Sequence, residues 1–174
     1  MPRPLNLPFD PIARAGELWA QRWGPSEAMK AVTAVMRAQQ ILLAELDGIL
    51  KTYDLTFARY EALVLLEFSA KGELPLSKIG ERLMVHPTSV TNTVDRLARQ
   101  GFVTRRRNPR DGRGVLAAIT ERGRGVVDRA TADLMAVDFG LGSLAQEELA
   151  ELFALLRRLR IEAGDFEAGD PGAG

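Results

Sequence analysis

The sequence predicts a mainly helical protein that carries one small β hairpin. Apolar residues recur at helical spacing through most of the 174 residues, while Asn-Pro and Asp-Gly turn signals fall within residues 108–112. Short apolar runs on both sides of these signals are typical of paired strands. Hydrophobic residues make up 46% of the chain, which is enough for a real core, and charged residues make up 26%.

Two helices are expected at the N-terminal end. The first spans about 12–23 and ends at Gly24-Pro25, and the second begins after the N-cap Ser26 and runs to about Tyr53. The second helix is unusually long for a small domain. Its apolar residues form a broad stripe, namely Met29, Val32, Val35, Met36, Leu42, Leu43, Leu46, Ile49 and Leu50. A stripe of this width needs a covering surface, and a second subunit is a common one.

Three further helices are expected between Thr56 and Gln100. The first begins at Thr56 and ends near residues 71–72, with its buried positions at Ala62, Leu63, Leu65, Leu66 and Phe68. The second is capped by Ser77 and buries Ile79, Leu83 and Met84. Pro87 suits the first turn of the third, in which Val90, Val94 and Leu97 face the core, and Gly101 ends it.

The outer face of the helix over 87–100 carries no apolar residue. It consists of Thr88, Ser89, Thr91, Asn92, Asp95, Arg96 and Arg99. Two short helices with a tight turn, the second with hydrogen-bonding residues outward, form a helix-turn-helix arrangement suited to a DNA major groove. A plain helical hairpin with a solvated polar face would show the same pattern, so these residues leave both interpretations open.

A hairpin over about 103–119 follows directly and predicts a winged helix-turn-helix. Residues 77–114 hold nine basic and three acidic residues, a net charge of +6 in a chain whose formal net charge is zero. An arginine-rich wing suits phosphates and the narrow minor groove. Arg105, Arg106 and Arg107 alternate along the strand, so they cannot all face one way. Thr120 then caps a helix to about Val137, and a last apolar-striped helix spans about 145–161.

The segment from Leu55 to about Val127 closely resembles the MarR family of bacterial transcription regulators. Its most specific pieces are "VDRLARQGFVTRR" and "NPRDGRGVLAAITERG". The resemblance implies a homodimer, joined by helices from both chain ends, that binds double-stranded DNA at pseudo-palindromic operators. It also implies a repressor that a small lipophilic or aromatic ligand often releases from DNA.

We expect the chain to divide into an N-terminal extension (1–24), a MarR-like domain (25–163) and a tail (164–174). The tail is rich in Gly, Asp and Ala and lacks periodicity, which predicts disorder. Within the domain, the DNA-binding lobe spans about 55–120, and the dimerisation helices span about 26–54 and 121–163. The extension could widen the dimer interface or lie across a ligand site.

Carried over residue by residue, the resemblance places DNA contacts on the recognition helix and on the wing. The recognition-helix positions are Pro87, Thr88, Ser89, Thr91, Asn92 and Arg96. On the wing, the resemblance places the bracing pair at Asp111 and Arg113. The candidate DNA contacts of the wing are Arg105, Arg107, Arg110 and Arg113. Gly112 stands where the family often has a second arginine, and Arg110 stands where an acidic residue is common.

Candidate ligand contacts are weaker, because aromatic residues at helical spacing are usually core or helix packing. Tyr53, Phe57, Arg59 and Tyr60 fall near the junction of the dimer helices and the DNA-binding lobe, where the family's ligands often bind. Trp19 and Trp23 could line a pocket, although packing of a helix face is the favoured interpretation.

Composition argues against several other classes of protein. There is no cysteine and a single histidine, His86, so thiolate and histidine-rich metal sites are excluded and no metal or cofactor is expected. No phosphate-binding loop or catalytic cluster appears, so an enzyme is not expected. No signal peptide or membrane span is apparent, which predicts a cytoplasmic protein. The rival functions are a winged-helix protein-interaction module without a specific DNA site and a small-molecule binding or modifying protein.

Overall fold

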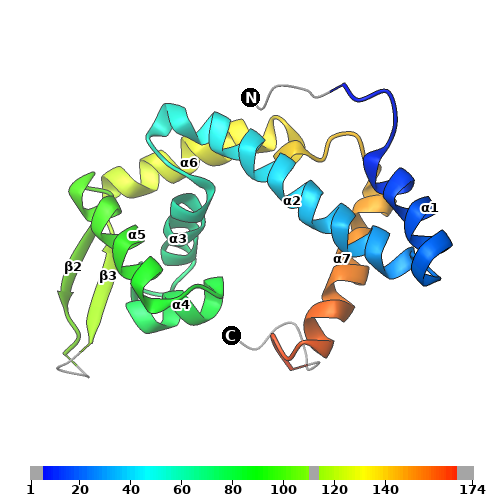
Figure 1. Ribbon diagram of the computed structural model, residues 1–174. Coiled ribbons are helices and arrows are strands. Elements are labelled where there is room, and N and C mark those ends of the chain that lie inside the picture. Colours follow the sequence, from blue (N-terminus) through cyan, green and yellow to red (C-terminus); the bar gives the residue numbers. More distant parts are fainter. Residues whose placement is uncertain (1–5, 110–113, 168–174) are drawn as a thin grey trace. The chain divides into compact units, whose positions relative to one another are not determined.

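The computed structural model describes residues 6–109 and 114–167 and divides the chain into two compact units, Met1–Phe139 and Gly140–Gly174. Both are mainly helical, as the sequence predicts (Figure 1). The elements are α1 (Pro11–Trp23), α2 (Glu27–Leu50), the 3-10 helix η1 (Lys51–Tyr53), α3 (Phe57–Glu67), β1 (Glu73–Pro75), α4 (Leu76–Leu83), α5 (Pro87–Arg99), β2 (Val103–Arg107), β3 (Val115–Ile119), α6 (Glu121–Met135), η2 (Asp138–Gly140) and α7 (Gln146–Glu162).

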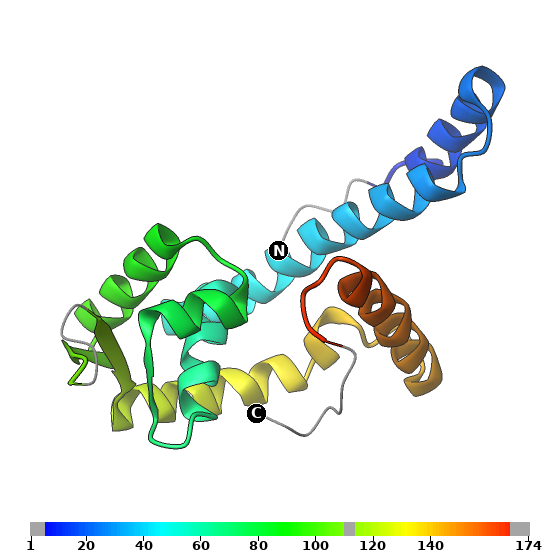
Figure 2. The same cartoon turned by 90° about the horizontal axis from the view of Figure 1, so that it is seen from below.

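The N-terminal extension folds as α1 and lies back along the N-terminal part of α2 (Figure 2). The Asp10 carboxylate caps α1 by accepting from the Ile12 amide at 2.8 Å, and Pro11 occupies the first turn. Gly16 of α1 lies close to α2, since a Cβ there would lie 2.7 Å from Cδ of Lys30. Glycine at this position therefore lets the two helices approach each other closely.

The core of the first unit is centred on α3. Ala62, Leu63 and Leu66 of α3 have no exposed surface. Helices α2, α5 and α6 and strand β3 contribute further core residues, including Leu46, Leu50, Val90, Val94, Leu97, Ala117, Val126, Val127, Ala130 and Leu134. The predicted inward faces of α3 and α5 are thus confirmed at most positions.

Two predicted core positions are wrong, because the helices that carry them end earlier than expected. Phe68 is 83% exposed, since α3 ends at Glu67 and the chain turns through Gly72 at φ 64°. Met84 is 81% exposed, since it ends α4 in the left-handed region at φ 53° and leaves the helical repeat. The predicted cap Ser77 is also wrong: α4 begins at Leu76 with Pro75 as its N-cap, directly after β1.

The chain between α2 and α3 is held by a long-range cap. Leu50 ends α2, η1 continues to Tyr53, and Asp54 turns the chain at φ 55°. The Asp47 carboxylate of α2 then accepts from the Phe57 amide at 2.6 Å at the start of α3. Thr56 is the N-cap residue by position, but its side chain makes no capping hydrogen bond.

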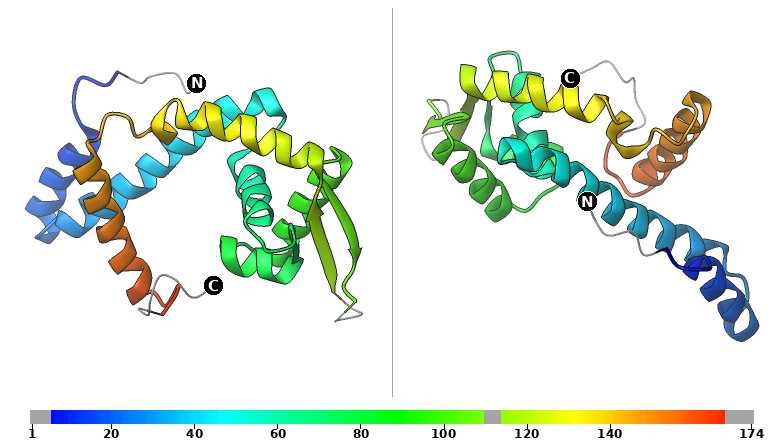
Figure 3. Two further views of the ribbon diagram at one scale, coloured as in Figure 1. Left: turned by 180° about the vertical axis from the view of Figure 1, so that it is seen from behind. Right: turned by 90° about the horizontal axis from the view of Figure 1, so that it is seen from above.

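The hairpin is part of a three-stranded antiparallel sheet with strand order β1-β3-β2. In this sheet Arg105 of β2 and Leu74 of β1 both pair with Ala117 of β3. The sequence predicted β2 and β3 but not β1. Figure 3 shows the hairpin extending away from the helices that carry it. Thr120 caps α6 as predicted, since its hydroxyl accepts from the Gly123 amide at 3.0 Å.

The second unit contains α7, whose residues all retain solvent exposure. Its start at Gln146 agrees with the predicted helix, while residues 168–174 of the predicted disordered tail lie outside the described residues. No helix in the described ranges has the length and hydropathy that a membrane crossing requires.

Candidate nucleic-acid interface

The turn between α4 and α5 is short and closely packed. The Val85 amide donates to the Gly80 carbonyl at 3.0 Å. A Cβ on Gly80 would lie 3.2 Å from Cγ2 of Val90, so glycine lets α4 approach α5. This packing fixes the angle at which α5 leaves the turn, and the two helices form the predicted helix-turn-helix.

Two residues of the turn prepare the start of α5. His86 is the N-cap, and its Nδ1 accepts from the Thr88 amide at 3.3 Å. Pro87 follows in the first turn, where its missing amide hydrogen removes no helical bond. His86 therefore has a structural role beside the surface that α5 presents.

The outer face of α5 is exposed, as the sequence predicts. The six candidate contacts on it are all solvent-accessible: Pro87, Thr88, Ser89, Thr91, Asn92 and Arg96. Val90, Val94 and Leu97 on the opposite face are at most 2% exposed, so the helix cannot rotate without losing core packing. Asn92 and Arg96 lie four residues apart and so share one face. They present an amide and a guanidinium, which suit base edges and phosphates.

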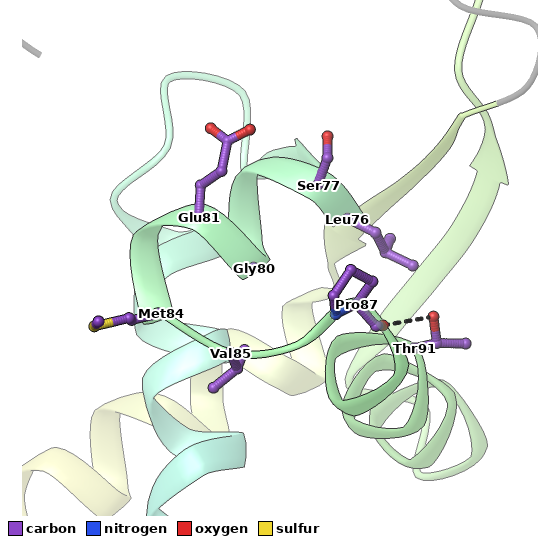
Figure 4. Close-up of a pocket in the computed structure, with 8 residues that line it drawn as sticks. All are labelled: Leu76, Ser77, Gly80, Glu81, Met84, Val85, Pro87 and Thr91. Carbon is purple, nitrogen blue, oxygen red and sulfur yellow. Dashed lines mark hydrogen bonds between the residues drawn. The ribbon is translucent and has the colours of Figure 1, made fainter. Parts of the chain in front are cut away.

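A hollow of about 650 Å³ lies beside this face, between α4 and the first turns of α5. Figure 4 shows Leu76, Pro87 and Thr91 around the space between the two helices. The Thr91 hydroxyl donates to the Pro87 carbonyl at 3.1 Å, so its hydrogen is already used and its oxygen remains an acceptor. Thr91 and Pro87 were predicted as candidate DNA contacts, whereas Leu76 was not, because it precedes the helix expected from the sequence.

The β2 arginines point to different partners, as their alternation predicts. Arg105 pairs with Asp95 of α5, while Arg106 pairs with Glu73 of β1. Arg107, the last residue of β2, is exposed. The Arg105–Asp95 pair joins the hairpin to the recognition helix, so Arg105 would have to exchange this partner to reach DNA. The three remaining wing candidates, Arg110, Asp111 and Arg113, lie outside the described residues.

The candidate ligand residues occupy two separate places. The Trp19 and Trp23 rings contact each other on α1 in a tilted arrangement, with centroids 4.8 Å apart, and Arg22 lies over Trp23. The other four candidates lie beyond the C-terminal end of α2. Since α2 has 24 residues, about 36 Å of helix separates the two groups. The structure therefore does not bring all six residues to one site.

Three of the four residues beyond α2 form specific side-chain hydrogen bonds. The Tyr53 hydroxyl donates to Asp133 Oδ2 at 2.6 Å, and this bond raises the pKa of Tyr53 above its usual range. Tyr60 is buried and its hydroxyl lies 2.8 Å from Thr131 Oγ1. Arg59 Nη1 donates to the Asp54 carbonyl at 2.8 Å.

Comparison with known proteins decides the family. The sequence profile of the MarR family matches residues 55–115. The crystal structure of Sco5413, a MarR family transcriptional regulator from Streptomyces coelicolor, aligns with a TM-score of 0.76 and 66% sequence identity, covering 80% of this chain and 97% of that one. The chain belongs to the MarR family.

Two further similar proteins extend the comparison. Sco3205 from Streptomyces coelicolor, solved in complex with DNA, has 25% identity and a TM-score of 0.74, covering 82% of this chain and 91% of that one. The organic hydroperoxide resistance transcriptional regulator of Bacillus subtilis is 32% identical over 111 residues, or 64% of this chain and 74% of the relative. This MarR family chain is a DNA-binding transcription regulator with a winged helix-turn-helix.

Proposed function

We propose that the chain acts as a homodimeric repressor that binds a pseudo-palindromic operator and that a small ligand releases from DNA. Each α5 would lie in a major groove and each hairpin would reach the adjacent minor groove. Two-fold symmetry then requires half-sites about one helical turn, ~34 Å, apart. Because its target is chromosomal DNA, the proposed regulator works in the cytoplasm, and no catalytic step is required of it.

The polar outer face of α5 carries this proposal. It is exposed along its length while the opposite face is locked into the core by Val90, Val94 and Leu97. Asn92 and Arg96 can bond base edges, and the exposed Arg107 can reach phosphates. A protein-interaction module has no need of this arrangement of short polar residues with arginines.

Uncovered apolar faces support the homodimer. On α2, Val32, Met36 and Ile41 are between 51% and 55% exposed. On α7, Phe153, Leu155 and Leu159 are between 61% and 63% exposed. Burying one such side chain fully is worth about 1.5–3 kcal/mol, so a subunit that covered these helices would be strongly favoured. A second copy offers the same apolar faces and closes the assembly by two-fold symmetry.

Selection of bound sites from a randomised DNA pool, at near-physiological salt, tests the proposal. Wild type is expected to enrich an inverted repeat with one-turn half-site spacing. Asn92→Ala is expected to relax the preference at one position of each half-site, by about 1–3 kcal/mol. Arg158→Gln, a change at an exposed arginine of α7, is the control.

Salt dependence separates DNA binding from a protein-interaction function. Removing one arginine that neutralises a phosphate lowers the steepness of log K against log salt by about 0.9. Arg96→Gln is expected to lower this steepness or to relax base preference, while Arg158→Gln changes neither. A folded, dimeric wild type that enriches no sequence and shows only a weak salt dependence would favour the protein-interaction module.

A further inference from the structure

Three arginines from two helices line an open hollow of about 530 Å³ on the first unit. Arg99 comes from the last turn of α5, while Arg122 and Arg129 come from α6. Seven residues are about two helical turns, so Arg122 and Arg129 share one face of α6, about 10 Å apart along its axis. We name this site the arginine hollow.

The charge of the arginine hollow is poorly balanced by its own lining. Asp54 is the one carboxylate among the described residues that line it, and its Oδ2 already accepts from Gln100 Nε2 at 2.9 Å. Within the described part of the chain, none of the three arginines forms an ion pair. Three guanidiniums against one carboxylate leave a net charge of +2 among the lining residues, while the Asp133 carboxylate, which accepts from the Tyr53 hydroxyl, is not among them.

The lining also has an unused hydrogen-bond acceptor. Gln100 Oε1 is buried and, within the described ranges, accepts no hydrogen bond. Its amide orientation is set by Nε2, which donates to both the carbonyl and the carboxylate of Asp54. Tyr53 adds an aromatic residue to the lining.

We propose that the arginine hollow binds a small organic dianion, such as a dicarboxylate or a phosphate monoester. Guanidiniums bind carboxylates and phosphates through paired hydrogen bonds, and two negative charges match the net charge of the lining. The volume is within the range of small-molecule sites. This inference rests on the proposed ligand-responsive function and names the chemistry of one ligand.

The position of the hollow suits a regulatory site. Gln100 bonds the end of α5 to the α2–α3 turn, so a dianion held by Arg99 and Arg129 would contact the recognition helix and α6 together. Within the first unit, Figure 1 shows the C-terminal end of β2 and the α2–α3 turn at opposite ends of the DNA-binding lobe. The hollow, which Asp54 of this turn lines, therefore lies away from the C-terminal end of β2.

Calorimetric titration of the full chain without DNA tests the proposal. The probes are inorganic phosphate, succinate and acetate at about pH 8, where phosphate is mostly a dianion, and at constant ionic strength in chloride. Phosphate, succinate or both are expected to bind at one site per chain, at least about tenfold more tightly than the monoanion acetate. Phosphate alone would indicate a phosphate monoester, and succinate alone a dicarboxylate.

Variants locate the binding site. Arg122→Gln and Arg129→Gln are each expected to weaken dianion binding about fivefold or more, and Arg129→Lys is expected to weaken it less. Arg82→Gln, a change at an exposed arginine of α4 outside the hollow, is the matched control and leaves binding unchanged. Arg129→Gln is the decisive variant, since Arg122 also stacks on the Phe102 ring and its loss could disturb folding.

Three outcomes would overturn the proposal: no saturable dianion binding, equal binding of acetate, or binding that neither substitution weakens. Operator binding is measured on the same samples. If Arg122→Gln and Arg129→Gln weaken operator binding while wild type binds no dianion, the hollow holds DNA phosphate instead. If wild type binds its operator but no dianion, only this proposal fails, while the DNA-binding function stands.

Discussion

Replacing Gly123 with alanine is expected to destabilise the junction between the hairpin and α6. Gly123 lies in the first turn of α6 and is buried. An added Cβ would overlap the Phe102 carbonyl oxygen and lie 2.8 Å from Cγ1 of Ile119. That carbonyl is main chain, and it accepts from the Thr120 amide at 3.0 Å and from the Thr120 hydroxyl at 3.2 Å.

The expected loss follows from three contributions. Overpacking a well-filled site costs about 1–3 kcal/mol. Displacing the Phe102 carbonyl weakens two hydrogen bonds, each worth about 0.5–1.5 kcal/mol. Alanine regains about 1 kcal/mol through its higher helix propensity. The net expectation for Gly123→Ala is a decrease of about 1–5 kcal/mol in the free energy of unfolding.

Gly125 provides a matched control in the same helix. A Cβ there would meet only Nη1 of Arg129, at 3.5 Å, which is an ordinary contact with a flexible side chain. Gly125→Ala is therefore expected to stabilise the protein by about 0.5–1 kcal/mol. Urea unfolding followed by circular dichroism, with all variants at one protein concentration, measures both changes. Equal stabilities for the two variants would refute the predicted overlap at Gly123, because helix propensity alone would then explain the data.

Three further predictions concern the apolar face of α7, the Tyr53 hydroxyl and the Arg105–Asp95 pair. Leu155→Glu places a charge in the apolar face of α7, and sedimentation is expected to show at least a roughly tenfold weaker dimer; an unchanged dimer would place the interface elsewhere. The difference in phenolate absorbance between wild type and Tyr53→Phe isolates the raised pKa of Tyr53, and Asp133→Asn is expected to return it towards 10.0. Since that pKa is raised on folding, the stabilisation from the Tyr53–Asp133 hydrogen bond is present below about pH 10 and is lost as pH rises through the folded pKa. An Asp133→Asn protein in which Tyr53 titrates unchanged would contradict this assignment. In a double-mutant cycle, Asp95→Asn and Arg105→Gln are expected to couple by at most about 1 kcal/mol in stability, and a much larger value would show that the pair is shielded from solvent.

The elements that were predicted well carry their own local signals. Helix α5 has Pro87 at its start, Gly101 beyond its end and three apolar residues on one face, so its bounds and its inward face follow from the sequence. The hairpin is marked by turn residues between two apolar runs. These signals also placed the candidate DNA contacts of α5 on an exposed surface.

The features that were missed depend on residues distant in sequence. Strand β1 has three residues and no alternating pattern, and it exists because it pairs with β3, which lies far along the chain. The α3 cap comes from Asp47 in the preceding helix, and the Arg105 partner comes from α5. The arginine hollow combines residues from α5, α6 and the Asp54 turn, a proximity that no local spacing reveals.

The exposed apolar face of α7 has a consequence for the abundance of the regulator. A helix that buries none of its residues gains little from packing and depends for its folding on whatever covers it. If the proposed dimer forms, newly made chains whose concentration is below the dissociation constant of the dimer would remain monomeric. Their Phe153, Leu155 and Leu159 would then be exposed to chaperones and proteases. Unassembled subunits would then be degraded faster than dimers, so the steady-state level in the cell would rise more steeply than in proportion to synthesis.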